Sequence, residues 1–269
     1  MATLGAGAQA APEQSRSIRG QVLDAETGAP IAYANIGVPG AAAGTVGGED
    51  GAFKLEDLGL KSTVLFSANG YESLAVPLGA FPGDGKIELT PLGRVFRERV
   101  SVSAKAPGDA RVFGREYKER GYGMGFASAL LGAEIAARIK IERPTYVESA
   151  HFVVTHTGGK AFLYRVNLYD FSGENVGEKL LHEDVLLKAK QERGTLTVDL
   201  RELGLVLRDD VLLSLEWIRG DAEMGNQNVM FRARPRTKSN VYLKLTSQMP
   251  FMPIERHGLG FYLKGQPLD

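Results

Sequence analysis

The chain of 269 residues contains no cysteine, which excludes disulfide bonds, thiolate nucleophiles and cysteine-ligated metal sites. It also has no net charge, because 32 basic residues balance 32 acidic ones. No overall field therefore favours nucleic acid or an anionic membrane as a partner. The sequence has no apolar run of the ~18 residues that a membrane-spanning helix needs. We expect no nucleic-acid partner and no transmembrane segment.

The motifs of several enzyme classes are also missing. None of the four histidines is followed three positions later by the glutamate of an H-x-x-E zinc pair. His182-Glu183 does not continue as a zincin motif, because Leu186 stands where the second histidine belongs. There is no G-x-S-x-G nucleophile motif. We therefore predict a protein that is not an enzyme, with no catalytic residue, no metal and no cofactor, and we expect the histidines at the surface or in turns.

Short apolar runs at strand spacing fill the first part of the chain. Between residues 18 and 55 they are interrupted by the turn-forming stretches ETGAP at 26–30 and GGEDG at 47–51. Runs this short are typical of strands, and glycine and proline supply the backbone angles of tight turns. The pattern predicts a small antiparallel sandwich.

This part of the chain resembles a known family. GxVxDAETGxPIxxANI at 20–36, GTVGGEDGAFKL at 44–55 and GYE at 70–72 resemble the carboxypeptidase-like regulatory domain over residues 16–92. The resemblance implies a transthyretin-like sandwich of seven strands. Such domains lie beside metallocarboxypeptidase catalytic domains and at the N-termini of many Gram-negative cell-envelope proteins. Gly48 departs from the family, whose members often carry a polar residue there, and this argues against a cation in that turn.

The segments on either side are assigned from composition. Residues 1–15 are expected to be a leader containing Ala8-Gln9-Ala10, the small-x-small pattern of a signal-peptidase site, although the charged start and apolar core are missing. We interpret the leader as the tail of a secretion signal, with a disordered cytosolic leader as the alternative. Residues 93–131 are predicted to be a linker with a glycine-rich loop at 121–125. The expected location is the periplasm or outer-membrane surface of a Gram-negative bacterium.

Residues 132–269 are predicted to form a second, larger sandwich of the jelly-roll type. Ile135, Ala137 and Ile139 alternate with polar or small residues, as on a strand with one buried face. The segments 162–170 and 195–218 loosely resemble carbohydrate-binding jelly rolls, which implies a binding architecture. The expected fold class is all-β, with two sandwich domains in tandem.

Two features of this second domain are binding candidates. The basic residues at every second position, Arg232, Arg234, Arg236 and Lys238, would share one face of a strand, and Pro235 would mark that strand as an edge or a bulge. A solvated face is the alternative for this basic row. Trp217 could stack on a sugar ring, although its phase with neighbouring leucines also fits a core residue. The ligand-binding candidates are Trp217, Asn226, Gln227, Arg232, Arg234 and Arg236.

These observations predict a non-catalytic accessory or binding protein of the cell envelope that recognises a glycan or a partner protein. The alternatives are a hydrolase with an unidentified site in the second sandwich and a purely structural envelope subunit. An open aromatic or basic face would favour binding, and a concave cluster of carboxylates and histidine would favour the hydrolase.

Overall fold

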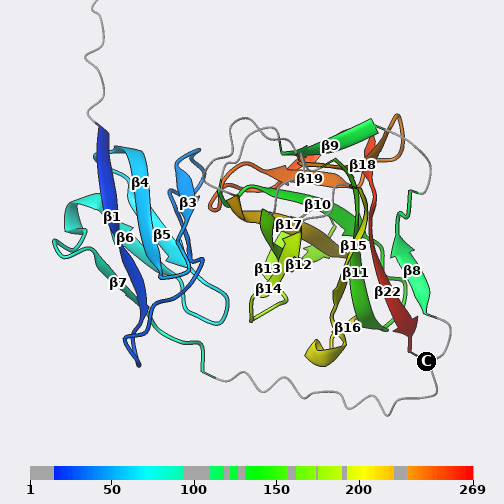
Figure 1. Cartoon of the computed structure of the whole chain (residues 1–269), viewed down its shortest axis with the longest axis horizontal. Coiled ribbons are helices and arrows are strands. Elements are labelled where there is room, and N and C mark those ends of the chain that lie inside the picture. Colours follow the sequence, from blue (N-terminus) through cyan, green and yellow to red (C-terminus); the bar gives the residue numbers. More distant parts are fainter. Residues whose placement is uncertain are drawn as a thin grey trace, which may run out of the picture.

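The computed structural model describes residues 15–93, 110–117, 122–126, 131–156, 162–173, 175–189, 193–220 and 229–268. Within these ranges the chain is built from strands, with two 3-10 turns at Leu78–Ala80 and Arg201–Leu203. No helix in this part of the chain is long and apolar enough to cross a membrane. The predicted all-β fold class is confirmed (Figure 1).

The N-terminal domain consists of two small sheets. The first has the order β4 (Ala52–Gly59), β1 (Ser15–Asp24) and β7 (Lys86–Leu89), and the second has the order β3 (Gly44–Val46), β2 (Asn35–Gly37), β5 (Thr63–Ser67) and β6 (Leu74–Pro77). The expected seven strands are therefore present. Their inward side chains form one core, which includes Val22, Ile36, Val64, Phe66 and Ile87.

Turn chemistry fixes the connections of this domain. After β1, Oδ1 of Asp24 accepts hydrogen bonds from the backbone N–H groups of Glu26 and Thr27, and Gly28 follows with a φ of 69°. These contacts form the turn that the ETGAP stretch predicts. The Tyr71 hydroxyl also donates to Asp24 Oδ2, so the GYE motif anchors the same turn.

The C-terminal domain is a larger sandwich of two sheets. The seven-stranded sheet has the order β13 (Asn175–Lys179), β12 (Phe162–Ser172), β17 (Val211–Gly220), β10 (Glu134–Ile139), β19 (Val241–Lys244) and β20 (Met252–Ile254), with β14 (Val185–Ala189) paired to β12. The eight-stranded sheet has the order β21 (His257–Leu259), β18 (Val229–Pro235), β11 (Thr145–His156), β22 (Phe261–Pro267) and β8 (Arg111–Gly114). In that sheet β15 (Gly194–Asp199) and β16 (Val206–Leu207) pair with β11, and β9 (Tyr122–Phe126) pairs with β18.

The core of this domain lies between its two sheets. The alternating residues Ile135, Ala137 and Ile139 of β10 are fully buried there, as the sequence pattern predicts. Phe152 and Phe261 from the facing sheet meet edge to face, with ring centroids 4.7 Å apart. The sandwich arrangement is therefore present, whereas a jelly-roll connection between its strands stays a prediction.

The predicted linker over 93–131 is wrong for two segments. β8 pairs with β22 at one edge of the eight-stranded sheet, and β9 pairs with β18. The glycines of β9 allow this pairing, because a Cβ at Gly125 would lie 1.8 Å from the carbonyl oxygen of Val229. The glycine-rich stretch therefore serves close packing between strands.

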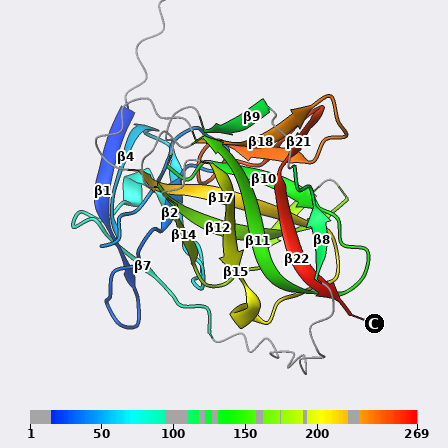
Figure 2. The same ribbon diagram turned by 45° about the vertical axis from the view of Figure 1, so that its right-hand side comes forward.

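The two domains pack directly against each other. Figure 2 shows β2 of the first domain beside β12 and β17 of the second, and the side chains of these strands are hydrogen-bonded across the boundary. The N-terminal domain thus covers part of the outer face of the seven-stranded sheet, which is the face turned away from the sandwich core.

Candidate functional site

The outer face of the seven-stranded sheet carries a row of polar residues. They alternate along β12, β17, β10 and β19 with the apolar residues of the core, so they point away from it. The strand register places them opposite one another: Arg165 faces Glu216, and Glu134 faces both Glu216 and Lys244. Seven of these residues are nonetheless buried. The set comprises Glu134, Arg165, Asn167, Tyr169, Ser214, Glu216 and Lys244.

Glu134 is the centre of one half of this network. Its carboxylate accepts hydrogen bonds from the Lys244 ammonium at 2.7 Å, from the Tyr169 hydroxyl at 2.8 Å and from the Ser214 hydroxyl at 2.5 Å. The Asn167 amide adds a fourth donor at 3.2 Å. The carboxylate is fully buried, and these donors satisfy its oxygen atoms inside the protein.

Glu216 and Arg165 form the other half, at the domain boundary. Arg165 Nη1 lies 3.2 Å from Glu216 Oε2 and donates to Asn35 Oδ1 of the N-terminal domain at 2.8 Å. Arg165 Nη2 donates to the carbonyl oxygen of Tyr33 at 2.6 Å. The Asn35 amide in turn donates to Glu216 Oε1 at 2.8 Å, so a closed ring of bonds joins the two domains.

The charges of the network are balanced. Arg165, Lys179 and Lys244 are the cations, and they pair with Glu216, Glu134 and the partly exposed Asp184. Burial alone would raise the pKa of Glu216, but attraction to Arg165 and the two lysines outweighs it and holds the pKa of Glu216 below its ordinary value. Burial also lowers the pKa of Lys179, which the charge of Glu216 only partly offsets.

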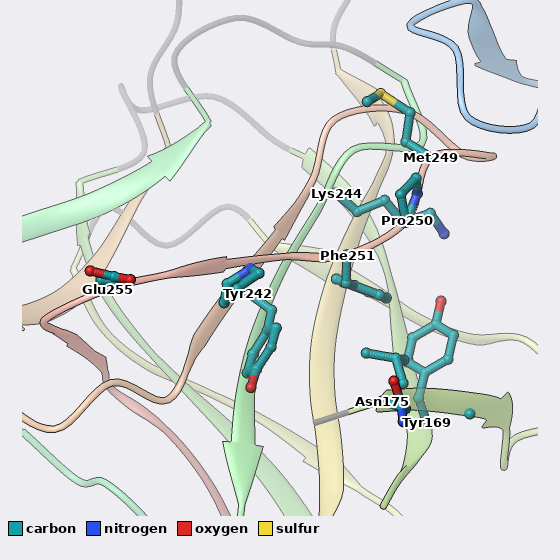
Figure 3. A pocket seen from close by; sticks show the side chains of 11 residues that line it. Tyr169, Asn175, Tyr242, Lys244, Met249, Pro250, Phe251 and Glu255 are labelled. Atoms are coloured by element: carbon teal, nitrogen blue, oxygen red, sulfur yellow. The ribbon is translucent and has the colours of Figure 1, made fainter. Parts of the chain in front are cut away.

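A pocket of about 660 Å³ opens on the same face beside this network. One wall is the start of β13, the other is the connection between β19 and β20, and the floor comes from β12 and β19. Figure 3 shows Lys244, Phe251 and Tyr169 gathered at one end and Glu255 at the other. The lining residues are Tyr169, Asn175, Val176, Gly177, Tyr242, Lys244, Met249, Pro250, Phe251, Pro253 and Glu255.

Aromatic rings and a fixed ammonium group define the chemistry of the pocket. The Tyr169 and Phe251 rings meet edge to face at 5.2 Å, and Tyr242 packs in the same way on Phe171 at 5.3 Å. The Lys244 Nζ atom lies 5.4 Å from the centre of the Phe251 ring. Burial and the nearby Glu134 charge raise the pKa of Tyr169 well above its ordinary value, so its hydroxyl stays a donor. The pocket thus combines apolar ring surface with polar groups that are held in place.

The structure places the sequence-predicted binding candidates elsewhere. Trp217 is only 1% exposed and lies in the core with Phe162 and Tyr164, so its proposed role as a stacking platform is wrong. Its phase with the core leucines of β17 decides its position. Asn226 and Gln227 lie outside the described residues.

Only part of the predicted basic row lies on one strand. Arg232 and Arg234 lie on β18, but this strand ends at Pro235 and Arg236 follows it with a φ of 57°. Arg234 stacks on the Tyr117 ring, 4.9 Å from its centre. β18 pairs with β11, and at Ala233 it has β9 on one side and β21 on the other, so of the predicted edge or bulge the edge is wrong. Pro235 is tolerated because it is the last residue of the strand.

His151 differs from the expectation of a surface histidine. It is buried on β11 and stacks on Tyr262 with ring centroids 4.5 Å apart. Its ring nitrogens lie 2.8 Å from Ser149 Oγ and 3.0 Å from Thr197 Oγ1. Burial, with a contribution from Lys264, lowers the pKa of His151 to about 4. It is therefore a neutral packing residue at pH 7.

Sequence reasoning missed the pocket and the buried network. The signal was the recurrence of Arg165, Asn167, Ser214 and Glu216 at the outward positions of strands that are otherwise strongly apolar. Within the described ranges no group of three or more histidine, aspartate or glutamate side chains is arranged to hold a metal ion.

Comparison with known families bears on the N-terminal domain. Residues 18–88 match the family model described as CarboxypepD_reg-like domain. The N-terminal domain is a CarboxypepD_reg-like domain. The match confirms the resemblance that the ETGAP and GGEDG turns carry, and it agrees with the seven-stranded sandwich. No curated protein matches the chain. The CarboxypepD_reg-like domain suggests a regulatory or binding module without catalytic activity.

Proposed function

We propose that the protein is a non-catalytic binding protein of the Gram-negative cell envelope, and that its C-terminal sandwich binds a neutral glycan. The observation that carries this proposal is the pocket on the outer face of the seven-stranded sheet. Its volume of about 660 Å³ lies within the range of small-molecule sites. The envelope location rests on the resemblance of residues 16–92 to modules of envelope proteins.

The lining chemistry favours a sugar over other small molecules. Tyr242 and Phe251 are only partly buried, and an aromatic ring face of this kind packs on the C–H face of a pyranose ring. Asn175, Lys244 and Glu255 provide donors and acceptors for hydroxyl groups.

The electrostatics favour a neutral ligand. The Lys244 ammonium is already paired with Glu134 at 2.7 Å, so its charge is compensated inside the protein. The other charged residue of the lining is the exposed carboxylate Glu255. An anionic glycan would therefore gain little attraction in the pocket and would meet Glu255 at its rim.

The hydrolase alternative finds less support. Glu255 is the one carboxylate among the described lining residues, and none of them is histidine. Glu134 and Glu216 are fully buried and occupied by internal donors. A glycosidase needs two carboxylates that reach the same bond of the substrate, and this lining offers one.

Calorimetric titration of the full chain with maltotriose, cellotriose, tri-N-acetylchitotriose and trigalacturonic acid tests the proposal. We expect at least one neutral trisaccharide to bind, the anionic one to bind more weakly, and Phe251→Ala to abolish the heat. Phe81→Ala is the matched control, since Phe81 is a partly buried phenylalanine of the N-terminal core. If no sugar binds, or if both variants behave alike, the glycan proposal fails and a partner protein becomes the subject of crosslinking.

A further inference from the structure

One wall of the pocket is bonded to the N-terminal domain. The connection from β19 to β20 contains Thr246, Ser247 and Gln248, directly before the lining residues Met249, Pro250 and Phe251. All three contact the first domain through hydrogen bonds. Ser247 Oγ lies 2.9 Å from the carbonyl oxygen of Ile36 and 3.2 Å from that of Thr45. Thr246 Oγ1 donates to Ala41 O at 3.3 Å, and Gln248 Nε2 donates to Ser67 Oγ at 3.1 Å.

The opposite wall has its own anchor. The first three residues of β13 line the pocket, and the same strand ends at Lys179. Lys179 Nζ donates to Asn69 Oδ1 of the N-terminal domain at 3.3 Å. The Asn69 amide donates to Asp184 Oδ1 at 2.8 Å, just before β14. A single asparagine of the first domain therefore contacts both the end of β13 and the residue before β14.

The contact surfaces also fit closely. A Cβ atom at Gly44 would lie 2.8 Å from the Thr246 Cβ, and one at Gly37 would lie 3.0 Å from the Gln248 Cγ. Both distances are shorter than normal carbon contacts, so the glycines are what allows the connection to approach. Around the polar bonds, Tyr33 and Val46 pack on Ile218 of β17. The boundary therefore combines close approach at Gly37 and Gly44 with an apolar contact at Ile218.

We infer that the N-terminal domain is a positioning element for the pocket: its contacts with Ser247, Gln248 and Lys179 hold the two walls at the separation that the ligand needs. None of the N-terminal residues in these contacts lines the pocket. The domain thus acts on binding without touching the ligand. The expected change in ligand affinity rests on the proposed function. The expected change in the mobility of the two walls does not depend on it.

The test loosens the boundary without changing the pocket lining. Gly44→Val introduces a side chain that strands favour but that collides with Thr246. Gly79→Val is the matched control, because nothing lies within 4 Å of a Cβ at that position. A second variant, Asn69→Ala with Gln248→Ala, removes hydrogen bonds and adds no bulk. Its control is Gln266→Ala, which removes the hydrogen bond that the Gln266 side-chain amide donates to Glu148 on the other sheet.

Hydrogen exchange followed by mass spectrometry measures the local opening of the two walls directly. We expect the backbone amides of residues 246–254 and 175–179 to exchange about fivefold faster or more in both boundary variants, since a net hydrogen bond changes a local opening equilibrium by about that factor. Residues 261–267 of β22 should keep the wild-type rates in both boundary variants, and the two walls should keep them in both control variants. Wild-type exchange of both walls in a folded Gly44→Val protein would overturn the inference.

Titration with the neutral trisaccharides is the second arm. If the walls must be held for binding, the dissociation constant should rise about fivefold in the boundary variants and stay unchanged in Gly79→Val and Gln266→Ala. Faster exchange with an unchanged dissociation constant would overturn the link to binding. Faster exchange with no sugar bound by any variant would support the positioning of the walls and refute the glycan proposal, so the two failures are distinguishable.

Discussion

Replacing Arg165 with methionine should destabilise the protein strongly. The guanidinium is 1% exposed and contacts Glu216, Asp184, Asn35 and the carbonyl oxygen of Tyr33. Without it, the Glu216 carboxylate stays buried with its main cation removed. Breaking a buried pair on one side costs about 3–5 kcal/mol, which should move the midpoint of urea unfolding down by roughly 1–2 M.

A double-mutant cycle separates the ion pair from simple packing. With Glu216→Gln the carboxylate charge is gone, so Arg165→Met should then cost about 1–3 kcal/mol less than it does in the wild type. Arg201→Met is the matched control, because the Arg201 pair with Asp199 is exposed and exposed pairs contribute little. Its urea midpoint should equal that of the wild type.

In Arg165→Met, the pH dependence of the contribution that Glu216 makes to stability should change sign. In the wild type the pKa of Glu216 lies below its ordinary value of 4.5, so its contribution is present above pH 4.5 and is lost as the pH falls further. In Arg165→Met burial remains while the main attraction is lost, and the Glu216 pKa should rise above 4.5. The difference in stability between the two proteins should therefore shrink as the pH falls from 7 to 4.5. A difference that is small at pH 7, or constant with pH, would refute the assignment of Arg165 as the counter-ion of Glu216.

Three further results are expected. Trp217→Ala should lower the free energy of unfolding by about 3–5 kcal/mol and leave sugar binding per folded molecule unchanged, which urea unfolding and calorimetry measure. The pKa of His151 is about 4 in the folded protein and 6.5 in the unfolded chain. Its contribution to stability should therefore be fully present above pH 6.5, and up to about 3 kcal/mol should be lost as the pH falls from 6.5 to 4. An NMR titration of His151 with a midpoint near 6.5 would contradict this. Gly20→Ala would place its Cβ 1.9 Å from the Gly85 carbonyl oxygen and should cost about 1–3 kcal/mol or more, whereas Gly79→Ala should leave the thermal midpoint unchanged.

The sequence was sufficient to predict the fold where one face of each strand is apolar and the turns are short. Ile135, Ala137 and Ile139 occupy the core as their alternation predicts, and the ETGAP turn forms on Asp24. β8 was missed because it has only four residues, and β9 was missed because glycine occupies every second position within it. Their pairing depends on partners more than 100 residues away along the chain.

The site was harder to predict, because alternation does not show that the polar face of a strand is also buried. Glu134 and Glu216 lie at positions that usually face water, but here both are buried. Asn35 of the N-terminal domain bonds Glu216, and Lys244 of β19 bonds Glu134. Trp217 was a candidate because an indole ring stacks well on a sugar, but its phase on β17 places it in the core. The pocket is lined by residues from β12, β13, β19 and the segment that follows β19, and no local pattern encodes how these segments pack together.

NMR of methionine methyl groups tests the central claim most directly. Met249 lines the pocket on the outer face of the seven-stranded sheet, whereas Met124 and Met230 lie on β9 and β18 of the other sheet. When the full chain is titrated with the trisaccharide that gives the largest heat, the methyl signal of Met249 should shift and saturate while those of Met124 and Met230 stay in place. Saturable shifts of Met124 or Met230 with an unmoved Met249 would place the ligand on the opposite sheet and contradict the account.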